Sequence, residues 1–160
     1  MELSWAEVDR LAQGLAHSIS KTFQPEAVVG IAHGGVFVGR AVASALGCEF
    51  YPVRISRRSR DKQVRRLPRL YGEMPSALKG KRVLIVDDVA SSGDTLQLAH
   101  ALASKAGAAI VLSACLVTRA GGFQPDWTAI SSAELVVFPW DYEQVNEDGR
   151  FDVLLDKTGA

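Results

Sequence analysis

Short apolar runs alternate with segments of helical periodicity along most of this chain. The helical segments cover about residues 5–22, 36–47 and 94–107, where apolar residues recur every three or four positions. The apolar runs are rich in Val, Ile and Leu, as strands covered on both faces are; they are AVVGIA (27–32), CEFYPVRI (48–55), RVLIVDD (82–88), AAIVLSACLV (108–117) and AELVVFP (133–139). This alternation predicts an α/β fold in which helices cover both faces of a mostly parallel, five-stranded sheet.

The length and composition favour a single domain over residues 1–160. A chain of 160 residues with 48% hydrophobic residues has the size of one ordinary domain and can bury a core. No secretory signal is visible, and no apolar run approaches the roughly 20 residues of a membrane-spanning helix. Cys48 and Cys115 stand far apart in apolar surroundings, as reduced cysteines do. We therefore expect a cytoplasmic protein with no membrane partner.

The formal net charge is zero, yet positive charge is concentrated between residues 54 and 69, where eight basic residues accompany one acidic residue. This stretch has no clean period and contains a proline, so we predict a flexible loop over about residues 56–75. Such a loop can neutralise the phosphates of a small ligand, or it can bind a nucleic acid backbone. Tyr51 and Tyr71 lie nearby but are not interleaved with the basic run, which disfavours nucleic acid because little is left for base stacking.

One motif in the middle of the chain, RVLIVDDVASSGDT (82–95), points to specific chemistry. Its strand ends in two adjacent acids, Asp87 and Asp88, and a turn of small and hydroxyl residues then leads into a helix. Backbone N–H groups at a helix N-terminus attract anions, and the turn lacks the Lys and the spacing of a Walker A loop. The carboxylates can accept hydrogen bonds from sugar hydroxyls or hold a hydrated Mg²⁺. A ribose 5-phosphate would use both halves, whereas a helix-capping role would explain only one acid.

The motif resembles the phosphoribosyl pyrophosphate (PRPP) binding motif of type I phosphoribosyltransferases. The resemblance extends over roughly residues 5–145, and the layout is most similar to that of the short xanthine–guanine and purine enzymes. It implies a type I phosphoribosyltransferase fold with a small C-terminal hood over about residues 119–160. It also implies a Mg²⁺-dependent transfer of the 5-phosphoribosyl group from PRPP to a nucleobase, with release of pyrophosphate. By analogy, a homo-oligomer such as a dimer or tetramer is expected.

The resemblance assigns roles to residues of four segments. The ribose hydroxyls and, through water, Mg²⁺ would be held by Asp87 and Asp88, which form the expected catalytic set with Ser91. The 5-phosphate would lie on Ala90, Ser91, Ser92, Gly93, Asp94 and Thr95. The pyrophosphate would lie on His33, Gly34 and Gly35, beneath a lid that carries Arg57 and Arg58. The base would contact Arg119, Leu135, Val136, Trp140 and Asp141.

The sequence departs from the pattern of the purine enzymes at four places. Ser91 stands where an acid usually handles a proton of the base, and His33 stands where Arg is common. Thr118 or Arg119 replaces a Lys that reads an exocyclic oxygen, and Leu135 replaces a stacking aromatic residue. The resemblance to the purine enzymes still makes a purine acceptor the first hypothesis. The alternatives are a non-purine acceptor and a regulator that keeps the ribose-phosphate pocket without turnover.

Overall fold

The computed structural model describes residues 1–58 and 64–141. The elements follow in the order α1 (Trp5–Ser20), β1 (Ala27–Ala32), α2 (Gly34–Leu46), β2 (Glu49–Arg58), β3 (Val64–Tyr71), a 3₁₀ turn (Ser76–Leu78), β4 (Arg82–Ala90), α3 (Asp94–Lys105), β5 (Ile110–Arg119) and β6 (Trp127–Ser132). Within the described residues, six strands form one sheet in the order β3-β2-β1-β4-β5-β6. In the part of the chain that the structure describes, β2–β3 is the one antiparallel pair and the other neighbouring strands are parallel. The α/β class and the mostly parallel sheet are confirmed, with one strand more than the five predicted.

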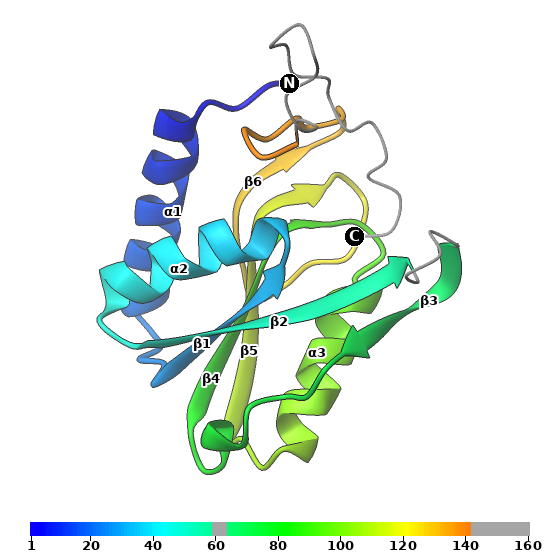
Figure 1. Ribbon diagram of the computed structural model, residues 1–160. Helices are drawn as coiled ribbons and strands as arrows, with labels where there is room; N and C mark the ends of the chain where they lie inside the picture. Colours follow the sequence, from blue (N-terminus) through cyan, green and yellow to red (C-terminus); the bar gives the residue numbers. More distant parts are fainter. Residues whose placement is uncertain (59–63, 142–160) are drawn as a thin grey trace, which may run out of the picture.

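Helices cover both faces of this sheet (Figure 1). α1 and α2 pack together on one face, and α3 lies on the other. Alternate residues of the central strands supply the two cores, because successive side chains of a strand point to opposite faces. Val28 and Leu84 pack with α1 and α2, whereas Val29 and Ile85 pack with α3. Burial on both sides explains the nearly continuous apolar sequence of β1 and β4.

Local signals set the ends of the helices. The Ser4 hydroxyl accepts a hydrogen bond from the Glu7 backbone N–H at 3.2 Å, and the Glu7 carboxylate accepts one from the Ser4 N–H at 2.6 Å. This capping box starts α1, and Gly47, with a φ of 68°, ends α2. Among the described residues, none of the helices is both long and apolar enough to cross a membrane.

The basic segment contains a β-hairpin, whereas the sequence predicts a flexible loop over residues 56–75. β2 continues into this segment, and β3 returns alongside it at the edge of the sheet. An edge strand tolerates Pro68 because one side of its backbone needs no pairing partner. Ile55 and Leu70 lie opposite each other and pack into the core beside α3. Residues 59–63 of the predicted loop lie outside the described residues.

The C-terminal part of the sheet also differs from the prediction. The last strand, β6, precedes the run 133–139 for which a strand is predicted, and it pairs with β5. Within that run, Val137 forms a single parallel bridge with Glu2. Of the hood predicted over about residues 119–160, the stretch 142–160 lies outside the described part of the chain.

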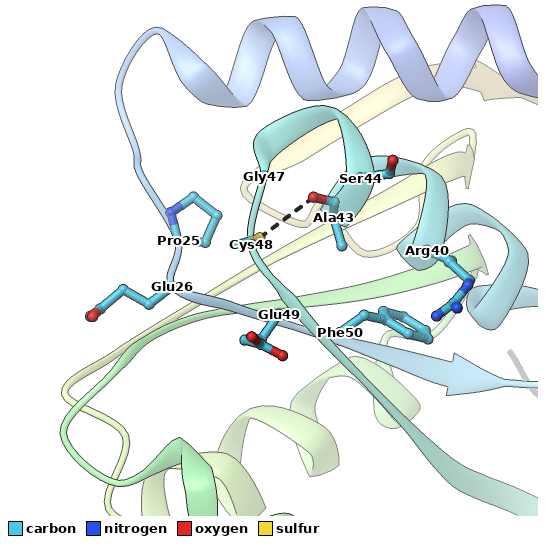
Figure 2. Close-up of a pocket in the computed structure, with 9 residues that line it drawn as sticks. All are labelled: Pro25, Glu26, Arg40, Ala43, Ser44, Gly47, Cys48, Glu49 and Phe50. Atoms are coloured by element: carbon cyan, nitrogen blue, oxygen red, sulfur yellow. Dashed lines mark hydrogen bonds between the residues drawn. The ribbon is translucent and has the colours of Figure 1, made fainter.

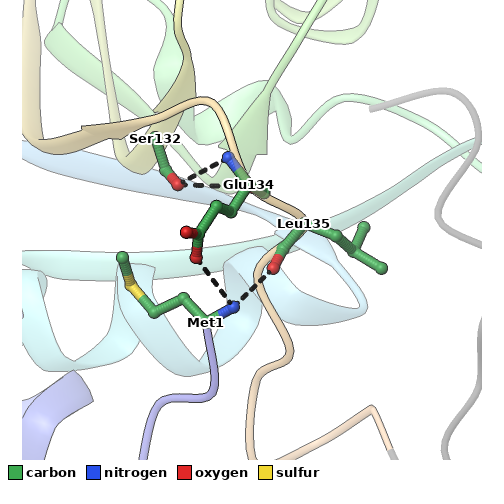
Figure 3. A network of polar contacts seen from close by, with 4 residues as sticks. All are labelled: Met1, Ser132, Glu134 and Leu135. Atoms are coloured by element: carbon green, nitrogen blue, oxygen red, sulfur yellow. Dashed lines mark hydrogen bonds and ion pairs between the residues drawn. The ribbon is translucent and has the colours of Figure 1, made fainter.

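The first residues of the chain hold the described part of the hood. The α-amino group of Met1 donates a hydrogen bond to the Leu135 carbonyl at 2.9 Å and lies 3.4 Å from the Glu134 carboxylate (Figure 3). The Leu3 N–H donates to the Val137 carbonyl at 2.9 Å. The hood is therefore attached on one side to β6 and on the other to the segment that precedes α1.

Candidate functional site

Three loops meet at the carboxyl edge of the neighbouring parallel strands β1, β4 and β5. They comprise residues 33–35, 91–93 and 120–126, respectively. Open α/β sheets bind ligands in the crevice at this edge. The fold thus brings together the predicted loops that follow β1 and β4. It adds the loop that follows β5, whereas the sequence-based prediction named only Thr118 and Arg119 at the end of that strand.

The acidic pair lies near the end of β4. Asp87 is 5% exposed, and its Oδ1 accepts a hydrogen bond from the Asp88 backbone N–H at 2.8 Å. Burial and, secondly, the negative charge of Asp88 raise the pKa of Asp87 well above its ordinary value. A buried acid beside a second acid is costly for stability, and such arrangements are typical of functional sites.

Glycines bring α2 into direct contact with this pair. A Cβ atom on Gly34 would lie 1.8 Å from Asp88 Oδ2, and one on Gly35 would lie 2.7 Å from the Val86 carbonyl oxygen. His33 precedes them as an exposed residue at the N-terminus of α2. The loop predicted to bind pyrophosphate therefore lies against the acids predicted to bind the ribose.

The turn from β4 to α3 has the geometry of an anion site. Gly93 adopts a φ of 82°, which favours glycine, and α3 begins at the next residue. The Ser92 hydroxyl accepts a hydrogen bond from the Asp94 N–H at 3.3 Å. Ala90 and Thr95 are buried at the two ends of the turn. Backbone N–H groups at the start of a helix of this length can bind a phosphate.

The loop that follows β5 packs on this turn, and the sequence analysis did not assign it to the site. The Phe123 N–H donates to the Ser91 carbonyl at 2.9 Å. A Cβ on Gly93 would lie 2.2 Å from the Phe123 ring, and one on Gly122 would lie 2.6 Å from the Ser91 carbonyl oxygen. Two consecutive glycines, Gly121 and Gly122, shortly after a strand are the sequence signal that could have identified this close approach.

Arg57 joins the basic hairpin to the same turn. Its Nη2 donates hydrogen bonds to Asp94 Oδ2 at 2.6 Å and to Ser92 Oγ at 3.2 Å. Of the two predicted lid residues, Arg57 thus contacts the predicted phosphate turn. Arg58 ends β2, and its side chain is outside the described part of the structure.

Other arginines of the hairpin lie on its opposite side. Ile55 packs into the core beside α3, so the side chain of the neighbouring Arg54 points to the other face of the strand. Arg57, by contrast, contacts the start of α3. The Arg54 guanidinium lies 5.1 Å from the centre of the Tyr71 ring. Arg54 is paired with Tyr71 and Ser56 with Arg69, which places Arg69 on the same outer side as Arg54. The basic segment is therefore divided between the face of the hairpin that meets the start of α3 and the opposite, exposed face.

An aromatic cluster brings the hood onto the acidic pair. The Trp140 ring stacks on Phe37 and Phe138, with centroid distances of 4.9 and 4.8 Å, and Trp5 lies 5.7 Å away. The Trp140 indole N–H donates to Asp88 Oδ2 at 3.2 Å. Trp140 therefore contacts the predicted ribose site directly, and Phe37, on α2, supports it.

The remaining residues predicted to contact a base lie in different surroundings. Asp141 Oδ2 accepts a hydrogen bond from the Phe138 N–H at 2.6 Å. Val136 is buried in the core, Leu135 is 45% exposed, and Arg119 is exposed at the end of β5. Their contact with a base stays a prediction.

The acidic pair fits a hydrated metal ion. Among the described residues, no three His, Cys, Asp or Glu side chains cluster in a way that could hold a metal. Mg²⁺ in proteins commonly keeps several waters and is bound by one or two carboxylates together with substrate phosphates. Asp87 and Asp88 supply oxygen ligands of this kind, so the donor set suits a Mg²⁺ that arrives with phosphate groups.

A cavity of about 820 Å³ lies away from the crevice, at the amino ends of β1 and β2 (Figure 2). It is lined by Pro25, Glu26, Arg40, Ala43, Ser44, Gly47, Cys48, Glu49 and Phe50. The Cys48 thiol donates to the Ala43 carbonyl there at 3.9 Å. None of the residues predicted from the sequence lines this cavity, so it is separate from the candidate site.

Known proteins share this fold and sequence pattern. The family model of the phosphoribosyl transferase domain matches residues 3–146. An orotate phosphoribosyltransferase from Phenylobacterium zucineum is 30% identical over 115 residues, which are 71% of this chain and 55% of that protein. The transcriptional regulator GfcR from Archaeoglobus fulgidus is 32% identical over 100 residues, which are 61% of this chain and 49% of that protein. The chain spans about half the length of these curated relatives.

A crystal structure of a purine phosphoribosyltransferase from Pyrococcus horikoshii Ot3 superposes with a TM-score of 0.77 and 28% identity, covering 92% of this chain and 97% of that one.

Proposed function

The chain belongs to the phosphoribosyl transferase domain family, and on this premise we propose that it transfers the 5-phosphoribosyl group from PRPP to a nucleobase and releases pyrophosphate. The observation that carries the proposal is the position of Asp87 and Asp88. They lie between the glycines that start α2 and the turn that starts α3. A sugar held by the acids would have a candidate phosphate-binding segment on either side.

In the proposed complex, each segment of the crevice has one task. Asp87 and Asp88 accept hydrogen bonds from the ribose hydroxyls, and residues 90–95 hold the 5-phosphate. Residues 33–35 hold the pyrophosphate, and Arg57 contributes positive charge from the hairpin. Mg²⁺, bound through water to the acidic pair, would neutralise charge on the departing pyrophosphate.

Catalysis would arise mainly from positioning and from charge stabilisation. A ring nitrogen of the base forms a bond to C1 of the ribose as the bond from C1 to the pyrophosphate oxygen breaks. The side chain of Ser91 is a hydroxyl and not a carboxylate, so it does not act as the general base that takes a proton from the nucleobase. The indole of Trp140 orients Asp88 through its N–H.

The residues of the hood are the basis for proposing which base accepts the phosphoribosyl group. A purine is the first candidate, and Trp140 with Asp141 would frame it. Ser91 and Leu135 leave a non-purine base as the alternative, and the similarity to an orotate enzyme supports keeping it. A homo-oligomer in the cytoplasm is part of the same proposal.

Mass-resolved turnover tests the proposal. The purified chain, Mg²⁺ and PRPP would be mixed with adenine, guanine, hypoxanthine, xanthine, orotate and uracil in turn. We expect one mononucleotide product, formed together with pyrophosphate, and its mass names the acceptor. The absence of every mononucleotide under conditions where PRPP binds would contradict transfer and favour a regulator.

A nucleic-acid-binding regulator is the second candidate, and the outer side of the hairpin favours it. Arg54 and Arg69 are exposed on that side, opposite the face that packs beside α3. A two-stranded antiparallel ribbon has the dimensions to enter the major groove of DNA. The similarity to the regulator GfcR adds support.

Salt-dependent binding of a DNA duplex separates this candidate from the enzyme. The logarithm of the association constant for DNA falls linearly with the logarithm of the salt concentration, with a slope of roughly −0.9 for each phosphate contact. If the outer arginines contact phosphates, replacing both Arg54 and Arg69 by Ala should make this negative slope shallower by about 1.8. Fluorescence anisotropy between 50 and 200 mM salt measures the slope. An Arg57→Ala variant is the matched control, since that side chain points into the crevice, and an equal slope in all variants would exclude the hairpin as the DNA-binding element.

A further inference from the structure

Arg57 has a hydrogen-bond donor that the protein itself does not use. Its side chain is 20% exposed. Among the described residues, its Nε is a buried nitrogen without a hydrogen-bond partner. A buried polar group without a partner is unfavourable, and for a charged guanidinium the cost is larger still. An acceptor that enters the crevice with a ligand would remove this cost.

Asp94 fixes the orientation of the guanidinium. Its carboxylate lies 2.6 Å from Arg57 Nη2, and Ser92 Oγ accepts from the same nitrogen at 3.2 Å. Both acceptors belong to the turn that starts α3. Nη2 is thereby committed to the protein, whereas Nε of the same planar group is buried without an acceptor among the described residues.

The position of Asp94 is otherwise hard to reconcile with a phosphate turn. A carboxylate in the first turn of a helix is favoured by the helix dipole, but beside a bound phosphate it would repel the ligand. The ion pair with Arg57 cancels that repulsion. It also ties the lid hairpin to the turn before a ligand is present.

We propose that Asp94 is a positioning residue that orients Arg57, and that Arg57 Nε donates a hydrogen bond to a phosphate of the ligand bound at residues 91–95. The proposal rests on the proposed function in taking that ligand to be a ribose 5-phosphate group. One guanidinium can bridge a carboxylate and a phosphate because its five donors diverge in a plane. The compact ammonium of Lys presents a point charge and lacks this geometry.

A double-mutant cycle tests the coupling of Arg57 and Asp94. Isothermal titration calorimetry would measure the Kd of ribose 5-phosphate, and of PRPP with Mg²⁺, for the parent, Arg57→Ala, Asp94→Ala and the double variant. We expect Arg57→Ala to weaken both ligands by about tenfold or more, as loss of a charge-assisted hydrogen bond does. Asp94→Ala should weaken them several-fold when Arg57 is present. In the Arg57→Ala background the same change should strengthen binding, because only the repulsion remains to be removed.

Two further variants separate positioning from charge and from folding. Arg57→Lys keeps the charge, and we expect it to bind as weakly as Arg57→Ala. Arg10→Ala removes an exposed arginine of α1, and we expect its Kd values to stay within about twofold of the parent. Thermal unfolding without ligand checks that each variant is folded.

The outcomes distinguish the inference from the proposed function. Parent-like binding of ribose 5-phosphate by folded Arg57→Ala, or tighter binding by Asp94→Ala alone, would overturn the inference. A parent that binds ribose 5-phosphate through Arg57 but does not bind PRPP would overturn the transferase and uphold the inference. A parent that binds neither ligand would overturn both.

Discussion

Replacing Asp87 and Asp88 together by Asn is expected to weaken PRPP binding by at least about a hundredfold while the fold stays intact. Hydrogen bonds to a charged group contribute about 1.5–3 kcal/mol each, and the double variant loses two charged acceptors. Asn has nearly the same shape as Asp, so the packing against Gly34 and Gly35 is preserved. Calorimetric titration with PRPP and Mg²⁺ measures the loss, and circular dichroism checks the fold.

The single variant Asp87→Asn should also be more stable than the parent, and the gain should depend on pH. Burial raises the pKa of Asp87 above its value in the unfolded chain, so the folded state binds this proton more tightly. The free energy of unfolding of the parent therefore falls as the pH rises from the ordinary pKa of Asp, near 3.8, through the raised pKa of Asp87. The variant has no carboxyl group at this position and does not show this fall. Urea unfolding should show a larger advantage of the variant at pH 8 than at pH 5.

The exposed Asp9 of α1 provides the matched control for these substitutions. Asp9→Asn should change neither PRPP binding nor stability by more than about 0.5 kcal/mol. A double variant that binds PRPP as tightly as the parent would show that the ribose site lies elsewhere. An Asp87→Asn variant less stable than the parent at pH 8 would contradict the cost assigned to its burial.

Gly34→Ala is expected to abolish turnover, with at least a hundredfold loss of kcat/KM. The added Cβ would lie 1.8 Å from Asp88 Oδ2 and 2.7 Å from Trp140 Nε1, so either the acid or α2 must move. Overpacking of this kind costs about 1–3 kcal/mol of stability, and a displacement of about 1 Å at a reacting centre is enough for such a kinetic loss. Steady-state kinetics with the identified base, together with urea unfolding, measure the two effects.

Gly14 offers a control with the same substitution in open space. A Cβ there would meet nothing within 4 Å, and the residue lies in the middle of α1. Gly14→Ala should therefore increase stability by about 0.5–1 kcal/mol and leave kcat/KM unchanged. Parent-like kinetics of Gly34→Ala would mean that α2 can retreat without disturbing the acids.

The parts of the fold that depend on local pattern could be predicted from the sequence. The apolar runs of β1 and β4 and the capping box of α1 are local signals, and the general rule for parallel sheets then places the loops after β1 and β4 at one edge. The hairpin could not be predicted in this way. Its Pro68 and arginines are unfavourable for a central strand, and β3 forms because it pairs at the edge and buries Leu70 against Ile55. β6 likewise depends on pairing with β5.

The same distinction applies to the candidate site. The residues of the β4–α3 turn are consecutive, so a single motif identifies them. The Trp140–Asp88 contact joins residues 52 positions apart, and Arg57–Asp94 joins residues 37 positions apart. Neither pairing is visible in one sequence, because only the folded sheet brings those segments together.

The attachment of the hood to the first residues of the chain has a consequence in time. The Met1–Leu135 contact spans 134 positions, and at a synthesis rate of 5–20 residues per second the later residue is made roughly 7–27 seconds after the first. The strands β1 to β5 are made during this interval, whereas the N-terminal segment has to wait for its partner. Trp140 is made later still, so its indole contact to Asp88 can form only after the strands β1 to β6 have been made. The contact between Trp140 and the acidic pair is therefore formed after the strands that carry the acids have been made.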